Sequence, residues 1–549
     1  TPGGMADDRH LFVTRGDLTA LHCDAWALPT DRDGSVTAAW VPALRAVGRG
    51  NGDGGGGRLD DAARTAVHAD GFVVLRAPGR DGPGVVACDT AAAHGDVAAC
   101  AAAAVRTVTH LERIVADAGT TPTRTLELPR TRPLVALPTV GVGGGGGRDV
   151  RGAVLAGQLA AVDEHLRAPG GSRSEADVVL VCFDQEHYTA AQRARRAAGA
   201  EATFAARAGE DLIAHARRLA AHARAGRLVP FVGAGVSMGA GLPSWVGLLD
   251  ELIAEAGMEG DREALGRLDL RDRAALIQTR LGAGELERIL LHRISRAPRV
   301  ALQHQLLASL PVAEAATTNW DELFERAWRD AGAGRVAVLP FDGSAGADHW
   351  IVKLHGTVRG GRLRGVVLTR EDYMRFGAER NALAGIVQAL LLTRHMLFVG
   401  FGLSDETFHR IAHDVRRVVA ATESVRGADG AYATSLSPSR HTVAADLWRG
   451  ELDVVPTRRE DDGPGRAGTA PAARRLEITL DALGMLAVDP LGHLLDPTFD
   501  GALSAAERPL AEALRRFAAE VDPQLARLDA EDPIAQAIGR WLGRMRPPA

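Results

Sequence analysis

Four short clusters of small and polar residues follow apolar runs in the second half of the chain. They are Gly233–Ser237 after Leu228–Val232, Thr317–Asp321 after Ala313–Ala316, Lys353–Gly356 after Ile351 and Val352, and Gly400–Asp405 after Met396–Val399. A buried strand that runs directly into such residues is typical of parallel α/β sheets, which bind ligands at the carboxyl ends of their strands. We therefore expect the four clusters to meet at one edge of a sheet.

The cluster Gly233–Ser237 predicts a turn that binds phosphate. Gly233 and Gly235 carry no side chain, so the backbone can turn tightly and approach a phosphate closely, and a helix start supplies free N–H groups. The stretch is neither Gly-x-Gly-x-x-Gly nor the Gly-Lys-Ser/Thr of a P-loop. It therefore predicts a nucleotide pyrophosphate site that differs from those two motifs.

His355, Asn319 and Asp321 are the candidates for bond-breaking chemistry. A neutral imidazole is a suitable base near pH 7, and cleavage of a glycosidic bond needs a rigid polar pocket around the sugar. Structural alternatives stay open for each cluster. Thr318 or Asn319 could cap the helix that begins near Asp321, His355 could be structural, and Asp405 could be a helix cap.

The ordered motifs Gly-Ala-Gly-x-Ser, Thr-x-Asn-x-Asp, Leu-His-Gly and Gly-x-x-Leu-Ser resemble the motif set of the sirtuin (SIR2) fold. The stretch Leu368–Tyr373 resembles the divergent bacterial SIR2-like branch, which is linked to defence against phage. This resemblance covers about half of the chain. It implies a Rossmann-like parallel sheet and NAD as the substrate.

The resemblance also implies a role for each matching residue. Asn319 and Asp321 would hold the nicotinamide ribose, Asn319 would also place a water molecule, and His355 would be the general base. The remaining NAD-binding residues would be Gly233, Ala234, Gly235 and Ser237 at the pyrophosphate and adjoining ribose, Thr317 beside them, and Gly400, Leu403 and Ser404 at the adenosine half.

The cysteines distinguish between possible reactions. Deacylating sirtuins usually carry a zinc ribbon built from two Cys-x-x-Cys pairs. The four cysteines, Cys23, Cys88, Cys100 and Cys182, lack that spacing and lie before residue 200, so we expect buried reduced thiols and no metal. Water is then the expected nucleophile.

The predicted function is therefore NAD+ glycohydrolysis to nicotinamide and ADP-ribose by an NAD-depleting effector of prokaryotic anti-phage immunity. ADP-ribosyl transfer and NAD-dependent protein deacylation remain alternatives. A non-catalytic sensor of NAD or ADP-ribose is a further alternative.

The first part of the chain resembles a macrodomain. The matching stretches are Gly16–Thr19 with Cys23–Thr30, Val135–Gly143 and Val178–Asp184. The resemblance implies that Asp17 contacts adenine and that Gly141, Gly143 and Gly144 wrap the diphosphate of an ADP-ribose-like nucleotide, which would regulate the NADase. A plain turn role for Asp17 stays open.

These motifs require an α/β chain with several parts. We expect a macrodomain-like α/β/α sandwich at residues 8–205, a connector helix at 211–226, a parallel-sheet SIR2 region at 227–487 and a helical C-terminal extension at 488–549. Helical insertions are predicted within 245–294 and 370–392, and loops at 50–57 and 458–473.

Composition narrows the possible partners. The chain has 549 residues, a net charge of −5 and only 4% aromatic residues, so we expect no direct nucleic-acid binding. Neither a signal peptide nor a long apolar segment is visible, which predicts a cytoplasmic protein without a membrane span. We expect a homo-oligomer, with the C-terminal helices as candidates for its assembly surface.

Overall fold

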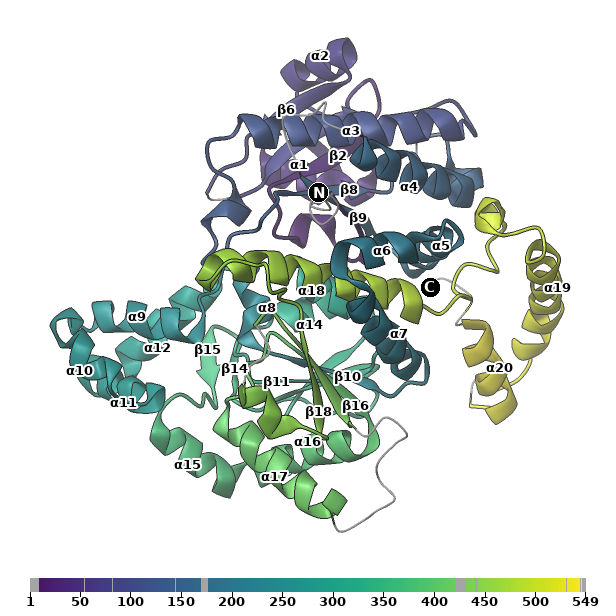
Figure 1. The fold of residues 1–549 in the computed structure, drawn as a ribbon. Coiled ribbons are helices and arrows are strands. Elements are labelled where there is room, and N and C mark those ends of the chain that lie inside the picture. The colour runs from purple at the N-terminus through teal and green to yellow at the C-terminus, as the bar shows by residue number, and fades with distance from the viewer. Residues whose placement is uncertain are drawn as a thin grey trace.

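The computed structural model describes residues 9–53, 55–80, 82–143, 145–168, 176–420, 431–439, 443–529, 531–543 and 545. Two β-sheets lie one above the other, with a layer of helices between them (Figure 1). The protein therefore has the predicted α/β architecture.

The N-terminal sheet is mixed and has six strands. Its strands, in spatial order, are β1 (Leu11–Arg15), β9 (Asp177–Cys182), β8 (Leu134–Pro138), β2 (Ala25–Thr30), β7 (Gly84–Asp89) and β6 (Phe72–Arg76). All neighbours pair in parallel except β6 and β7. The central strands are buried on both faces, which explains their nearly continuous apolar sequences.

Helices cover both faces of this sheet. One face packs against α3 (Val97–Asp117), α4 (Arg151–Arg167) and α5 (Gln185–Ala197). The other face packs against α6 (Ala200–Ala208), α7 (Glu210–Arg224), α13 (Leu302–Ala308) and α18 (Gly465–Ala487). The result is an α/β sandwich, and the finer assignment to a macrodomain stays a prediction.

The second sheet has seven strands, all parallel. In spatial order they are β12 (Val336–Leu339), β13 (His349–Lys353), β11 (Glu314–Thr317), β10 (Leu228–Val232), β16 (His395–Val399), β17 (Ala433–Ser437) and β18 (Leu452–Pro456). The four apolar runs described above predicted β10, β11, β13 and β16, and the apolar run Leu452–Pro456 predicted β18, whereas β12 and β17 were not predicted. Their carboxyl ends share one edge, where the four clusters lie.

The remaining elements surround these two sheets. The second sheet carries α8 (Ala234–Met238), α14 (Leu323–Asp330), α16 (Asn381–Thr393) and α17 (Glu406–Ala420). A helical group projects beside it (Figure 1), formed by α9 (Trp245–Glu255), α10 (Arg262–Gly266), α11 (Leu270–Leu281), α12 (Ala283–Ser295) and α15 (Arg370–Glu379). The smaller elements are α1 (Val41–Val47), α2 (Asp61–Asp70), β3 (Ser35–Val36), β4 (Gly50–Asp53), β5 (Gly56–Leu59), β14 (Thr357–Arg359) and β15 (Arg362–Arg364).

Buried polar contacts tie helix α18 to the N-terminal sheet and its helices. Asp481 of α18 accepts hydrogen bonds from Arg195 at 2.7 and 2.8 Å and pairs with His10 at 2.9 Å. Arg474 of the same helix pairs with Asp177 of β9 at 2.7 Å. One apolar core continues from the N-terminal sheet, through these helices, to the second sheet.

Two loop predictions are wrong where regular elements form, although residues 458–464 lie outside helices and strands, as predicted. Residues 50–57, with Gly54 outside the described residues, include strands β4 and β5, because Gly52 lets the two backbones approach closely: an added Cβ there would lie 2.5 Å from the Cα of Gly57. Residues 465–473 begin α18 although Pro471 lies inside it, since packing against α7 and α13 outweighs local propensity.

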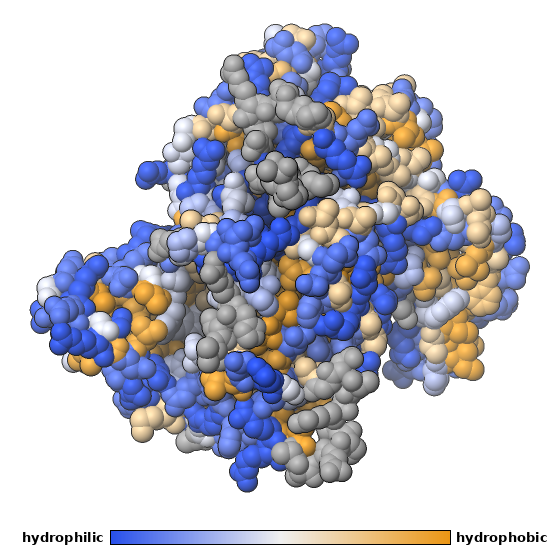
Figure 2. Space-filling model, viewed as in Figure 1, coloured by the Kyte–Doolittle hydropathy of each residue, from blue (hydrophilic) through white to orange (hydrophobic). Residues whose placement is uncertain are grey.

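The C-terminal extension is helical, as predicted, with α19 (Arg508–Leu525) and α20 (Pro533–Gly543) at one side of the molecule (Figure 1). Figure 2 shows apolar residues gathered over this pair of helices. Leu510, Phe517, Ile534 and Trp541 are exposed there.

In the described segments, no helix has the length and apolarity needed to span a membrane. All four cysteines are buried and unpaired.

Candidate active site

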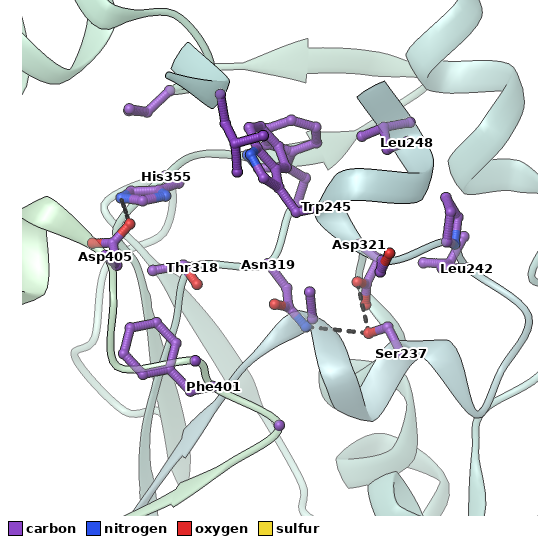
Figure 3. Close-up of a pocket in the computed structure, with 18 of the residues that line it drawn as sticks. Ser237, Leu242, Trp245, Leu248, Thr318, Asn319, Asp321, His355, Phe401 and Asp405 are labelled. Carbon is purple, nitrogen blue, oxygen red and sulfur yellow. Dashed lines mark hydrogen bonds and ion pairs between the residues drawn. The ribbon is translucent and has the colours of Figure 1, made fainter. Parts of the chain in front are cut away.

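A cavity of about 380 Å³ opens at the carboxyl edge of the seven-stranded sheet. All four clusters contribute to its lining. The predicted site residues that line it are Ala234, Ser237, Asn319, Asp321, His355, Gly400 and Ser404. The structure thus brings the proposed catalytic residues together in one cavity (Figure 3).

A chain of hydrogen bonds fixes the Asn319 side chain (Figure 3). Its Nδ2 donates to Ser237 Oγ at 3.1 Å, and Ser237 Oγ donates to Asp321 Oδ2 at 2.9 Å. Asp321 Oδ1 accepts from the backbone N–H of Leu323 at 3.1 Å. Among the described residues, this chain leaves Asn319 Oδ1 buried with no hydrogen-bond partner. A ligand with a hydroxyl or N–H group could satisfy that oxygen.

The residues behind this chain are structural. Thr317 Oγ1 donates to the Val232 carbonyl at 2.6 Å and accepts from the Asn319 N–H at 2.9 Å. Thr317 therefore braces Asn319 from behind and does not belong to the cavity lining. Lys353 is fully buried, forms an ion pair with Glu325 at 2.8 Å and donates to the backbone carbonyl of Asp321.

His355 lies at the other end of the cavity from Ser237 (Figure 3). Its Nε2 is 3.3 Å from Thr407 Oγ1 and 3.7 Å from Asp405 Oδ2. Burial lowers the pKa of His355, and this effect outweighs the opposite influence of the Asp405 carboxylate. The imidazole is therefore neutral at pH 7 and can accept a proton.

Asp405 combines two functions. Its Oδ1 accepts from the Phe408 N–H at 3.0 Å, which is the helix-capping role that the sequence left open. Its Oδ2 accepts from the hydroxyl of Tyr373 at 3.0 Å and faces His355. The Tyr373 ring meets the His355 ring edge-on, with the centroids 5.2 Å apart. No local pattern indicated this contact, because Tyr373 belongs to an inserted helix.

The glycines make a tight backbone crossing. The N–H of Gly235 donates to the carbonyl of Gly400 at 2.9 Å, and an added Cβ on Gly235 would lie 2.9 Å from the Cα of Gly400. Gly233 also packs on Gly400, which has a positive φ of 67°. Leu403 has a φ of 51° and packs into the apolar core instead of the cavity lining.

The inserted helices supply an apolar wall that the sequence did not identify. Trp245 and Trp320 meet edge-to-face with ring centroids 5.5 Å apart. Leu248 of α9, with Leu290 and Ile294 of α12, extends this wall. Their helical pattern was visible in the sequence, but which face would turn toward the clusters depends on tertiary packing.

A ring of charges surrounds the mouth of the cavity. Arg271 pairs with Asp269 at 2.7 Å and also with Glu406, and its guanidinium lies 5.5 Å from the centre of the Tyr373 ring. Arg370 pairs with Asp269 at 3.4 Å. These pairs tie α11 to α15 and α17, so they hold the insertion against the cavity.

The predicted N-terminal ligand residues follow β1 and β8 and have local contacts. Asp17 accepts at 2.7 Å from both the N–H and the hydroxyl of Thr19, which is the plain turn role. Gly141 packs on Cys100, Gly143 faces open space, and Gly144 lies outside the described residues. Within the described residues, no hydrogen bond joins Asp17 to this loop, so the N-terminal site stays a prediction.

The comparison with protein families agrees with this site. Residues 313–448 match the model of the SIR2-like domain. That segment holds Asn319, Asp321, His355 and the Gly400 turn, whereas the glycine cluster precedes it.

Curated relatives match part of the chain. It is 31% identical over 201 residues to the NAD(+) hydrolase ThsA of Enterococcus faecium, which covers 35% of this chain and 41% of that protein. It is 28% identical over 197 residues to the NAD(+) hydrolase ThsA of Bacillus cereus strain MSX-D12, covering 34% and 39%. The Defense-associated sirtuin 2 of Bacillus subtilis is 26% identical over 200 residues, covering 36% and 20%. The chain thus spans less than half of each relative and shares distant homology with them.

Proposed function

We propose that this protein hydrolyses NAD+ to nicotinamide and ADP-ribose. The observation that carries the proposal is Asn319: its Oδ1 is buried and finds no partner in the described part of the chain, in a cavity that also contains a neutral His355. A ribose hydroxyl or an ordered water molecule would supply the missing donor. The ThsA relatives are named NAD(+) hydrolases, which supports the same reaction.

The chemistry follows from the positions of these groups. The bond between ribose C1′ and the pyridinium nitrogen breaks, and its electron pair stays with nicotinamide, which leaves neutral. The oxygen of water bonds to C1′, and its proton passes to His355 Nε2 or Nδ1 and then to solvent. Asn319 and Asp321 orient the ribose, while Trp245 and Trp320 exclude bulk water.

We further propose that the activity serves prokaryotic anti-phage defence by depleting NAD. Support comes from the SIR2-like match and from the relative named Defense-associated sirtuin 2. Regulation by a nucleotide at the N-terminal domain and assembly into a homo-oligomer complete the proposal. The exposed apolar residues of α19 and α20 are the candidate assembly surface.

The test is NAD+ turnover by the full chain beside Asn319→Ala and His355→Ala, with nicotinamide and ADP-ribose quantified. We expect both variants to lose about 100-fold or more of kcat. His349→Ala is the matched control, because His349 lies on β13, just before His355, and hydrogen-bonds the Ala333 carbonyl at 2.7 Å, away from the cavity.

Two outcomes would contradict hydrolysis. Deacylation of an acyl-lysine peptide, without NAD+ loss when the peptide is omitted, would identify a deacylase. Tight NAD+ binding without turnover under any condition would identify a sensor.

A further inference from the structure

A second cavity, of about 160 Å³, adjoins the proposed active site. Both cavities touch Gly400, and they meet neighbouring faces of α8: Ala234 and Ser237 line the first, whereas Gly235 and Met238 line the second. Self-contained ligand pockets usually measure roughly 300–1,000 Å³. The second cavity therefore suits part of a ligand whose remainder lies elsewhere.

The walls of this cavity come from both halves of the chain. The N-terminal half contributes a segment that runs from Leu126 to Thr131, together with His22. The second half contributes α8, the start of α13, Pro438 after β17, and residues Thr469 to Glu477 of α18. The cavity therefore lies at the interface between the two sheets.

The lining is mostly apolar, with a few buried polar atoms at its edges. Leu126, Leu128 and Leu476 supply apolar surface. His22 Nε2 and Arg130 Nε are buried and have no hydrogen-bond partner among the residues that the structure describes. A flat heteroaromatic ring with polar edges matches such a lining, because its faces are apolar and its ring nitrogens can pair with these atoms.

The N-terminal segment is held firmly at this position. Asp24, directly before β2, accepts hydrogen bonds from the Thr123 hydroxyl at 2.7 Å and from the Leu134 N–H at 2.8 Å. These bonds anchor the chain on both sides of the segment that lines the cavity. Between those ends, Glu127 accepts from the N–H and hydroxyl of Ser244, which lines the first cavity. The same segment thus lines the second cavity and supports a residue that lines the first.

A charge pair joins the two walls of the second cavity. Arg130 of the N-terminal segment donates to both carboxylate oxygens of Glu477 in α18, at 2.6 and 2.8 Å. Glu477 is also 3.5 Å from Gln303 Nε2 at the start of α13. The wall is therefore built from fixed, paired groups and is suited to a defined ligand.

We propose that the adenosine half of the NAD+ substrate occupies this interdomain cavity, so that the N-terminal domain completes the substrate site. The diphosphate would pass over α8 at Gly400, between the adenosine and the ribose at Asn319. This inference rests on the proposed function and adds a contribution that lies outside the SIR2-like match. The position of residues 126–131 then sets the affinity for NAD+.

The experiment fills the second cavity from each wall separately. Leu128→Trp fills it from the N-terminal segment, and Ala473→Phe fills it from α18. Ala467→Phe is the matched control, because Ala467 lies on the same helix but is exposed. Thermal unfolding of the full chain verifies that each variant is folded.

The expected result is a separation between two substrates. Both filled variants should raise KM for NAD+ at least about tenfold with kcat nearly unchanged, since only binding is lost. Hydrolysis of nicotinamide mononucleotide, which lacks adenosine, should remain as in the wild type. Equal losses with both substrates, or an unchanged KM for NAD+, would overturn the proposal.

A binding measurement separates this proposal from the proposed function. Calorimetric titration with ADP-ribose tests the cavity even in a protein that turns over no NAD+, and both filled variants should lose this binding. Absence of ADP-ribose binding by the wild type, or equal binding by all variants, would overturn the inference. If the filled variants lose binding of free AMP but keep the KM for NAD+, the cavity is a separate nucleotide site. That result would also overturn the inference.

Discussion

Substitution of Ser237 by alanine tests the hydrogen-bond chain at the centre of the site. Ser237 Oγ accepts from Asn319 Nδ2 at 3.1 Å and donates to Asp321 Oδ2 at 2.9 Å, and the residue is only 2% exposed. Alanine would leave two buried polar atoms without that partner. Each such atom costs about 1–3 kcal/mol, so we expect a loss of about 2–6 kcal/mol in the free energy of unfolding.

The effect on activity follows from the freedom gained by Asn319. Without Ser237 Oγ, nothing described in the structure holds the amide nitrogen, so Oδ1 and Nδ2 can exchange places. A displacement of about 1 Å in a group that positions the substrate costs about 100-fold in rate. We expect a loss of about this size in kcat/KM for NAD+. Nicotinamide release at low NAD+ concentration measures it, and urea unfolding measures stability.

Ser309→Ala is the matched control. Ser309 is also buried and also makes two hydrogen bonds, accepting from the Arg15 N–H at 2.9 Å and donating to the Gln305 carbonyl at 2.7 Å, outside the cavity. It should lose comparable stability and keep its kcat/KM. The reasoning about Asn319 fails if Ser237→Ala keeps kcat/KM within about threefold of the wild type, or if both variants lose activity equally.

Three further predictions concern buried charges. Lys353→Met should lower the free energy of unfolding by about 3–5 kcal/mol, because it removes the ion-pair partner of Glu325. Adding Glu325→Leu should restore most of this stability, as measured by urea unfolding. A double variant as unstable as Lys353→Met would contradict this. Asp405→Asn should lower the pKa of His355 further, since the carboxylate raises it, so the acid limb of the kcat/KM profile should move to lower pH; a move to higher pH would refute that role. Burial lowers the pKa of His10 from 6.5 to about 4, so the unfolded chain binds a proton in that window and stability should fall by about 3 kcal/mol as pH drops through it. His10→Asn should flatten this dependence, and an unchanged slope between pH 7 and 4 would show that His10 does not contribute.

The sequence predicted the central geometry of the site because that geometry follows from topology. Asn319, His355 and Gly400 each follow a strand, and parallel strands bring their carboxyl ends to one edge. Nothing more than chain order and apolar runs was needed. The site residues named for chemistry therefore lie in one cavity, although their roles remain proposals.

The parts that escaped prediction depend on contacts between distant segments. Tyr373 acquires its significance only when α15 packs beside Asp405, thirty-two residues away in sequence. Gly235 was expected to approach a phosphate, but its N–H bonds to Gly400, a partner that no local pattern identifies. Helix α18 was partly predicted as a loop, because Pro471 and several glycines dominate its local sequence while its packing surface belongs to another part of the chain.

The pairing of Asp177 with Arg474 affects the stability of the N-terminal sheet as a separate fragment. Asp177 is fully buried in the N-terminal sheet, yet the guanidinium that hydrogen-bonds it belongs to a helix almost three hundred residues later. A fragment that ends near residue 205 would keep Arg130, 3.6 Å from the carboxylate, but would lose the two hydrogen bonds from Arg474. Hydrogen bonds between charged groups contribute about 1.5–3 kcal/mol each, so the N-terminal sheet should be markedly less stable alone than in the full chain.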